Sequence, residues 1–210
     1  MVVGKLIETD LDVAEGAAWL AIQCPRMAMA LEQTGPLPLR RRGDGFAELL
    51  SAIVSQQVSV ASANAIWARL EAAAMTTPQA VGGAEWEDLR ALGLSRQKIR
   101  YAQALALADI DYPALRRLPD EDIIKRLVTV PGIGRWTAEI YAMFSLGRAD
   151  VFAPGDLALQ VAAQSLYALE ERPKEAQLRA MAQEWSPWRS VAARLLFAYY
   201  RVIKQRDGIT

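Results

Sequence analysis

The side chains that could carry out chemistry in this 210-residue chain are few. It contains no histidine and a single cysteine, Cys24, so it lacks the ligands of Cys/His zinc sites and of cysteine-bound iron–sulfur clusters. A histidine-dependent catalytic triad is excluded for the same reason, and no disulfide can form within the chain. Any catalysis must therefore rest on carboxylates, hydroxyl groups, lysines or backbone dipoles.

Two aspartates lie beside a loop that contains proline and glycine. The segment "ADVFAPGDLALQ" carries both Asp150 and Asp156. Asp156 follows Pro-Gly and precedes an amphipathic run, which is typical of a helix N-cap. Capping alone would explain this aspartate, so its position leaves both a structural and a catalytic role open.

A second unusual stretch, "TVPGIGRWTAE" (129–139), places one proline and two glycines between two amphipathic segments. Pro131 cannot continue the preceding helix, and Gly132 and Gly134 allow backbone angles that larger residues avoid. A turn this tight leaves the first amide groups of the next helix unpaired, and these groups suit a phosphate. A plain turn between two helices is the alternative interpretation.

The elements that must position these residues are predicted to be helices, because apolar residues recur at three- and four-residue spacing without sustained alternation. The fold class is therefore predicted to be all-α. We expect N-caps at Asp10, Ser59, Ser95 and Asp156. The clearest loop is 34–45. The expected helices are 10–23, 26–33, 44–56, 59–75, 84–91, 96–109, 119–128, 135–146, 157–169, 174–184 and 187–205.

Composition limits the possible partners and compartments. Lysines plus arginines and aspartates plus glutamates number 24 each, so a basic surface for nucleic acid would require local segregation of charge. The first residues have no apolar signal core, and no run of about 18 uncharged apolar residues indicates a membrane span. An intracellular, cytoplasmic protein without a membrane partner is expected.

The segment "LVTVPGIGRWTA" resembles the helix-hairpin-helix motif of the base-excision DNA glycosylases, in which hairpin amides bind a DNA phosphate. The resemblance implies a monovalent cation, Na⁺ or K⁺, at the hairpin, and no cofactor for catalysis. It implies phosphate contacts from the amides of Gly132, Gly134 and Thr137, and cation contacts from the carbonyl groups of Val128, Val130 and Ile133.

In the same superfamily (HhH-GPD), the hairpin, a Gly/Pro-rich loop and an aspartate form one signature, and "VFAPGD" matches it with Asp156 as the catalytic carboxylate. Asp150 matches the strand-like lead-in instead. A carboxylate beside the deoxyribose would stabilise the positive charge that develops as the base leaves, and could orient or deprotonate the water. Members that also cut the DNA backbone carry a lysine where this sequence has Trp136, so the resemblance implies a monofunctional enzyme that leaves an abasic site.

Three further segments resemble the 3-methyladenine DNA glycosylase II group, so that the similarity extends over roughly residues 44–205. They are "AELLSAIVSQQVSVASANAIWARL" (47–70), "LGLSRQKIRYAQALA" (92–106) and "PWRSVAARLLFAYY" (187–200). The resemblance implies two helical subdomains with an active-site cleft between them.

The expected division of the chain has three parts. Residues 1–43 would form N-terminal helices that pack with the C-terminal subdomain. Residues 44–115 would form the central helical subdomain. Residues 116–210 would carry the helix-hairpin-helix (119–146) and the aspartate loop.

The resemblance assigns Gln57, in "SQQVS", to the wedge that enters the minor groove and fills the gap left by an extruded nucleotide. An exposed glutamine at a helix end is the alternative interpretation. Basic residues that could contact phosphates around the lesion are Arg40–Arg42, Arg96, Lys98 and Arg100.

A flipped base stacks on aromatic rings, and a methylated, positively charged purine gains a cation–π attraction. Trp136 and Phe197 occupy positions that form the base pocket in the family, and Tyr141 is a weaker candidate. Ile140 and Leu157 replace aromatic residues found in some relatives, which puts the breadth of substrates in doubt.

The expected activity is hydrolysis of the N-glycosidic bond of alkylated purines in double-stranded DNA, chiefly 3-methyladenine and also 7-methylguanine, by a monomeric repair enzyme of the bacterial nucleoid. Three alternatives stay open. They are a non-catalytic DNA-binding module, a helical interaction protein, and a glycosylase for deaminated or oxidised bases.

Overall fold

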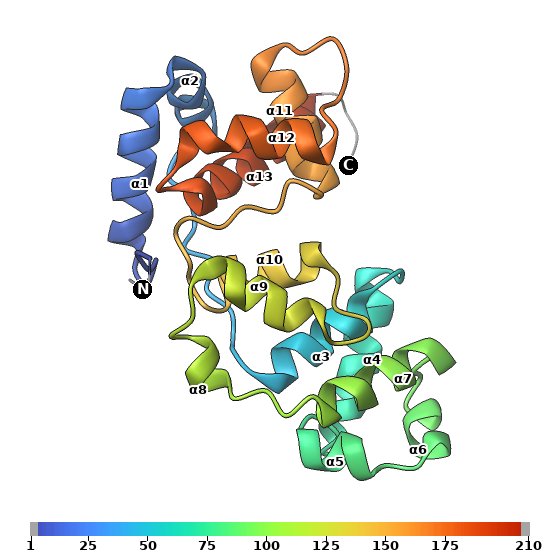
Figure 1. Ribbon diagram of the computed structural model, residues 1–210. Helices are drawn as coiled ribbons and strands as arrows, with labels where there is room; N and C mark the ends of the chain where they lie inside the picture. The colour runs from blue at the N-terminus through green and yellow to red at the C-terminus, as the bar shows by residue number, and fades with distance from the viewer. Residues whose placement is uncertain (1–3, 207–210) are drawn as a thin grey trace. The chain divides into compact units, whose positions relative to one another are not determined.

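The computed structural model describes residues 4–206 and confirms the all-α prediction (Figure 1). Within this range the single β-structure is an isolated antiparallel bridge between Leu6 and Arg148. None of the helices described between residues 4 and 206 is both long enough and apolar enough to cross a lipid bilayer.

The chain divides into two compact units, Met1–Arg41 with Ala142–Thr210, and Arg42–Tyr141. The hairpin belongs to the second unit, together with the central helices, whereas the sequence analysis grouped it with residues 116–210. The reason lies in the local packing: Gly132 of the hairpin lies against the ring of Tyr101, which comes from a central helix. The N-terminal helices share a unit with residues 142–210.

The first unit is built around the last helix, α13, which packs against α1, α2 and α11. Its sides bury aliphatic and small residues such as Val191, Ala192 and Leu195. The elements of this unit are α1 (Asp10–Gln23), α2 (Pro25–Thr34), α11 (Leu157–Tyr167), α12 (Glu175–Met181), the 3₁₀-helix η1 (Ala182–Trp185) and α13 (Arg189–Arg206).

Helix α1 approaches α13 closely at Gly16. A Cβ atom at this position would lie 2.6 Å from Cγ2 of Val191 and 2.7 Å from Cε3 of Trp188. Real side chains do not tolerate such separations, so a glycine is required where the two helices touch. Gly16 and Trp188 therefore fix which face of α1 points to the core.

The second unit is organised around α7, which packs against α3, α5 and α6. Helix α10 begins in this unit, and its last three residues, 142–144, are grouped with the first unit. The remaining elements are α3 (Phe46–Ser55), α4 (Val60–Ala72), α5 (Pro78–Gly83), α6 (Trp86–Ala91), α7 (Arg96–Leu107), α8 (Tyr112–Leu115), α9 (Asp120–Val128) and α10 (Arg135–Phe144).

The helix starts follow local capping chemistry. The side chains of Ser59, Ser95 and Asp156 accept hydrogen bonds from amides of the helices that follow them, so these three predicted caps are confirmed. The fourth was wrong: α1 is capped by Thr9, not by Asp10. Thr9 accepts from the amide of Asp12, whose carboxylate accepts in return from the amide of Thr9, which makes a capping box.

The predicted helices agree with the structure to within a few residues at each end, but α5 and α8 were missed. Both are short, at six and four residues, so neither shows a helical repeat of apolar positions. Each starts from a capping side chain followed closely by a proline, with Thr77 before α5 and Asp111 before α8.

Candidate nucleic-acid interface

The hairpin between α9 and α10 is held by short-range backbone hydrogen bonds. The amide of Val130 donates to the carbonyl of Leu127 at 3.1 Å, and the amide of Ile133 donates to the carbonyl of Val130 at 3.0 Å. Gly132 has φ +90°, a conformation that side chains rarely adopt, and a Cβ atom there would overlap the ring of Tyr101. The glycine at 132 is therefore dictated by both the backbone and the packing.

The start of α10 leaves amide groups free to bind an anion. Among the described residues, the first backbone hydrogen bond of this helix runs from the amide of Ala138 to the carbonyl of Gly134, at 3.0 Å. The amides of Gly134 and Thr137 come before Ala138 in the chain, so neither has an acceptor within the helix. Nothing lies within 4 Å of the space that a Gly134 side chain would fill, so a ligand can approach the backbone there.

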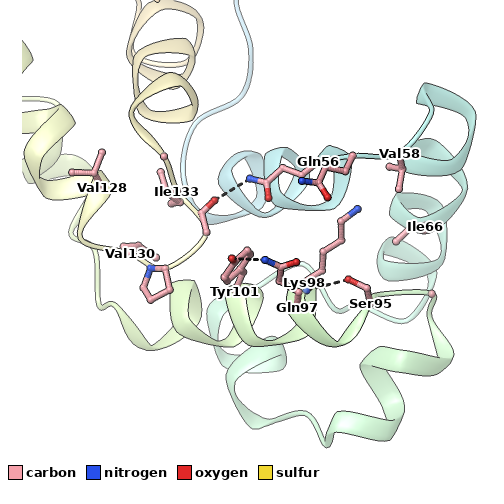
Figure 2. Close-up of a pocket in the computed structure, with 15 residues that line it drawn as sticks. Gln56, Val58, Ile66, Ser95, Gln97, Lys98, Tyr101, Val128, Val130 and Ile133 are labelled. Atoms are coloured by element: carbon pink, nitrogen blue, oxygen red, sulfur yellow. Dashed lines mark hydrogen bonds between the residues drawn. The ribbon is translucent and has the colours of Figure 1, made fainter. Parts of the chain in front are cut away.

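Gln57 lies in the turn between α3 and α4 and lines the same cavity as the hairpin. Figure 2 shows this cavity, with Gln56 and the hairpin residues Val130 and Ile133 labelled. This cavity, of about 620 Å³, belongs entirely to the second unit. Gln57 is exposed and has φ +56°, so the turn presents it from a strained backbone. The structure thus brings the predicted wedge and the predicted phosphate-binding loop to one surface. The residues with predicted cation-binding carbonyl groups, Val128, Val130 and Ile133, line the same cavity.

Lys98 is not placed as a free phosphate contact, contrary to the sequence analysis. Its side chain is largely buried, and Nζ donates a 2.6 Å hydrogen bond to the carbonyl of Val54 at the end of α3. Burial lowers the pKa of the Lys98 ammonium from its ordinary value. The lysine therefore secures a helix end inside the unit.

Asp156 caps α11 with a fixed carboxylate. Its Oδ1 accepts from the amide of Ala158 at 2.9 Å and from that of Leu159 at 3.3 Å, and its own amide donates to the carbonyl of Ala153 at 3.0 Å. The side chain is half-buried. Capping thus orients the carboxylate of a residue that is only partly buried, which is compatible with a second role.

Asp150 is committed to the fold. One oxygen of its carboxylate accepts from Nε of Arg189 at 2.7 Å, and the other accepts from Nη2 of Arg189 at 2.9 Å and from Oγ of Ser186 at 2.8 Å. Both oxygens are therefore in use. The assignment of Asp156 as the catalytic carboxylate stays a prediction.

The two predicted pocket residues on α10 have different surroundings. Trp136 is 45% exposed at the start of the helix, whereas Tyr141 is 3% exposed. The Tyr141 hydroxyl donates to Oδ1 of Asp44 at 3.0 Å and accepts from the amide of Gly45 at 2.9 Å. Burial raises the pKa of Tyr141 well above its usual range. Tyr141 therefore anchors residues 44 and 45, and its part in a base pocket stays a prediction.

Phe197, on α13, lies in the first unit among aromatic and basic groups. Its ring centroid is 6.3 Å from that of Phe144, and the guanidinium carbon of Arg40 is 5.7 Å from it. The guanidinium of Arg194 lies 4.8 Å from the Phe144 ring. Burial, together with the nearby charges of Arg40 and Arg41, lowers the pKa of Arg194 to about 10.

Sequence reasoning missed one residue that joins two parts of this surface. Nε2 of Gln56 donates a 2.9 Å hydrogen bond to the carbonyl of Gly132, across 76 positions of sequence. The adjacent Gln57 drew attention because it matched a family position. The available signal was the pair of glutamines at a helix end, where one amide can point to solvent and the other inward.

Comparison with known protein families identifies the family of this chain. Residues 50–187 match the model of a family described as the HhH-GPD superfamily of base excision DNA repair proteins. The chain belongs to this family. The hairpin, the turn at Gln57 and the loop before Asp156 all lie within the part of the chain that matches.

Curated members of the HhH-GPD superfamily resemble the chain over different shares of their length. DNA-3-methyladenine glycosylase 1 of Schizosaccharomyces pombe is 32% identical over 157 residues, which cover 70% of this chain and 69% of that protein. DNA-3-methyladenine glycosylase 2 of Escherichia coli is 33% identical over 174 residues, covering 75% of this chain and 57% of that protein. A putative DNA-3-methyladenine glycosylase of Bacillus subtilis is 33% identical over 124 residues, and the match spans 43% of its length.

Solved structures of HhH-GPD proteins share the fold. A DNA-3-methyladenine glycosidase from Bacillus halodurans superimposes with a TM-score of 0.82 and 29% identity, covering 94% of this chain and 92% of that chain. The 3-methyladenine DNA glycosylase of S. pombe, solved in complex with abasic DNA, gives a TM-score of 0.76 with 29% identity, covering 87% and 95%. The similarity to these proteins therefore covers the fold as well as the sequence.

Proposed function

We propose that this protein is a DNA glycosylase that hydrolyses the N-glycosidic bond of alkylated purines in double-stranded DNA, chiefly 3-methyladenine and also 7-methylguanine. The observation that carries the proposal is the placement of Asp156. It stands at the matching position of the HhH-GPD signature as a half-exposed carboxylate oriented by two amides of α11. Relatives of similar sequence and fold, named as 3-methyladenine glycosylases, support the same substrate class.

The carboxylate would act on the sugar. As the base departs, positive charge builds on the deoxyribose, and an anion held in a fixed orientation stabilises that state more than it stabilises the neutral ground state. The same carboxylate can orient or deprotonate the attacking water. A base already made cationic by alkylation leaves without a protein acid, which fits a chain that contains no histidine.

The hairpin would hold the DNA backbone. The amides of Gly132, Gly134 and Thr137 are the proposed donors to one phosphate, and the positive end of the α10 dipole adds to the attraction. The carbonyl groups of Val128, Val130 and Ile133 are oxygen donors of the kind that a hard cation such as Na⁺ or K⁺ accepts. The cation would supply positive charge next to the same phosphate.

The remaining predicted residues would act on the extruded nucleotide. Gln57, as the wedge, would fill the space that the nucleotide leaves, and Trp136 and Phe197, as the base pocket, would stack on the base. Because Trp136 cannot form a Schiff base, we expect release of the base without cleavage of the strand. We infer a monomer that acts on the nucleoid in the cytoplasm.

Replacement of Asp156 by Asn tests the function directly. Asn keeps the N-cap, because its side-chain oxygen can still accept from α11, but removes the negative charge. Release of methylated bases from alkylated duplex DNA should fall by about 10²-fold or more, as expected when a group that stabilises the transition state is lost. Binding to the duplex should survive.

Asp111→Asn provides the matched control. Asp111 is also an N-cap, its Oδ1 accepting from the amide of Ala114 at 2.8 Å, and it lies at α8, outside the proposed site. The control should release bases at the wild-type rate. Wild-type activity in Asp156→Asn would remove the proposed mechanism, and duplex binding by the wild type without release of any base would favour a non-catalytic module. A panel of deaminated and oxidised lesions separates the remaining glycosylase class.

A further inference from the structure

The turn between α3 and α4 is strained and yet well defined. Gln56 ends α3 with an extended backbone, and Gln57 then takes φ +56°, which is uncommon for a residue with a side chain. Such a conformation persists only where surrounding contacts impose it. Hydrogen bonds from distant parts of the sequence hold the residues that directly precede Gln57.

Two long-range hydrogen bonds hold the chain just before the strained residue. The Gln56 side chain donates to the carbonyl of Gly132 at 2.9 Å (Figure 2). Lys98 donates to the carbonyl of Val54, near the end of α3, at 2.6 Å. The turn is thus tied to the hairpin by one bond and to α7 by the other.

The hairpin end of the first bond cannot adjust freely. The peptide group between Gly132 and Ile133 is held on both sides, because its carbonyl accepts from Gln56 and its amide donates to the carbonyl of Val130 at 3.0 Å. Tyr101 blocks the space beside Gly132. Since the next peptide group carries the amide of Gly134, the orientation that Gln56 imposes reaches the proposed phosphate donor.

We propose that Gln56 is a positioning residue that couples the turn carrying Gln57 to the hairpin, so that a backbone phosphate bound at the hairpin holds the wedge in place. This inference rests on the proposed function for its role in base release. Gln56 contacts neither the lesion nor the sugar in this scheme. It acts through Gln57 and Gly132.

The experiment compares Gln56→Leu, which keeps the approximate length and removes the donor, with the control Gln103→Leu. Gln103 lies on α7 and is not among the residues that line the cavity, and its Nε2 likewise donates to a backbone carbonyl, that of Ala84, at 3.1 Å. Single-turnover release is measured on a lesion paired normally and on one opposite a mismatched base, whose extrusion requires less free energy. The same change is then made in a Gln57→Ala background.

Gln56→Leu should slow release from the paired substrate by about tenfold, the size expected for one lost hydrogen bond. The loss should be smaller on the mismatched substrate and under about twofold in the Gln57→Ala background, because a residue that acts through Gln57 has nothing left to position. Gln103→Leu should behave as the wild type. Equal losses on both substrates, or losses that add to those of Gln57→Ala, would show a general structural defect and overturn the inference.

Hydrogen–deuterium exchange tests the coupling without base release. With duplex DNA that contains a stable abasic-site analogue, amides of residues 56–59 and 132–134 should both gain protection in the wild type, and only 132–134 in Gln56→Leu. Equal protection of both segments in the variant would refute the coupling. A wild type that shows coupled protection but releases no base would refute the proposed function and leave this inference standing.

Discussion

Asp150 and Arg189 form a two-point ion pair, with Nε 2.7 Å from Oδ1 and Nη2 2.9 Å from Oδ2. The two side chains are 25% and 26% exposed, so the pair is partly shielded from water. Asp150 lies six residues before Asp156 in the sequence, and its two-point contact with Arg189 assigns it a role in stabilising the fold.

Replacing Asp150 by Ala should therefore lower the free energy of unfolding, because the Arg189 guanidinium and the Ser186 hydroxyl lose their acceptor. A loss of about 1–3 kcal/mol is expected for charge-assisted bonds in a partly exposed setting. Denaturant unfolding measures it, and base release per folded molecule should stay near the wild-type level. A stable variant without activity would instead point to Asp150 as the catalytic carboxylate.

Gly132→Ala and Gly134→Ala should separate folding from DNA binding. At Gly132 the positive φ and the Tyr101 ring oppose a side chain, so thermal unfolding should show a destabilisation of about 1–3 kcal/mol. Gly134 has open space around it. Gly134→Ala should fold normally and weaken duplex binding, because a methyl group hinders approach of a phosphate to the amide. Unchanged duplex affinity in this variant would argue against the hairpin contact.

Lys98→Met tests whether this lysine binds DNA. Removal of the Nζ donor leaves the Val54 carbonyl without its partner, so the free energy of unfolding should fall by about 1–3 kcal/mol. The slope of log affinity against log salt concentration should not change, since Lys98 neutralises no phosphate. A slope smaller by about one would show a direct phosphate contact instead.

Alkaline pH should destabilise the protein partly through Tyr112. Burial, with a smaller contribution from the Asp44 charge, raises the pKa of Tyr112 to about 12, whereas an unfolded tyrosine titrates near 10. The stabilisation is therefore complete below about pH 10 and is lost as the pH rises towards 12. In Tyr112→Phe, the free energy of unfolding should decline less steeply over this range. Denaturant unfolding at several pH values gives the comparison, and parallel curves would contradict it.

Much of the fold could be predicted from the sequence, because apolar spacing and helix caps are local signals. Helix α1 begins and ends where its apolar spacing predicts, and Ser59 and Ser95 cap their helices through side chains three residues from the amides they bind. The error at Asp10 is also local, since two adjacent residues could serve as the cap and the bond to Asp12 selects Thr9.

The candidate site could be predicted only in part, because several of its contacts join residues that are far apart in the sequence. The hairpin glycines and Gln57 could be identified from motifs, and the structure places them around one cavity. No sequence pattern predicted the hydrogen bond from Gln56 to the carbonyl of Gly132, or the one from Lys98 to the carbonyl of Val54. Such bonds depend on which helices become neighbours, and that is decided by tertiary packing rather than by any one segment.

The close contact at Gly16 fixes which face of α1 stays exposed to solvent. Because only a hydrogen atom fits between this residue and the Trp188 ring, α1 cannot rotate about its axis to hide Leu11 and Ile22, which are each 80% exposed. Polar replacements at these two positions should cost the native state little. They are suitable places to attach a fluorophore or a surface tether.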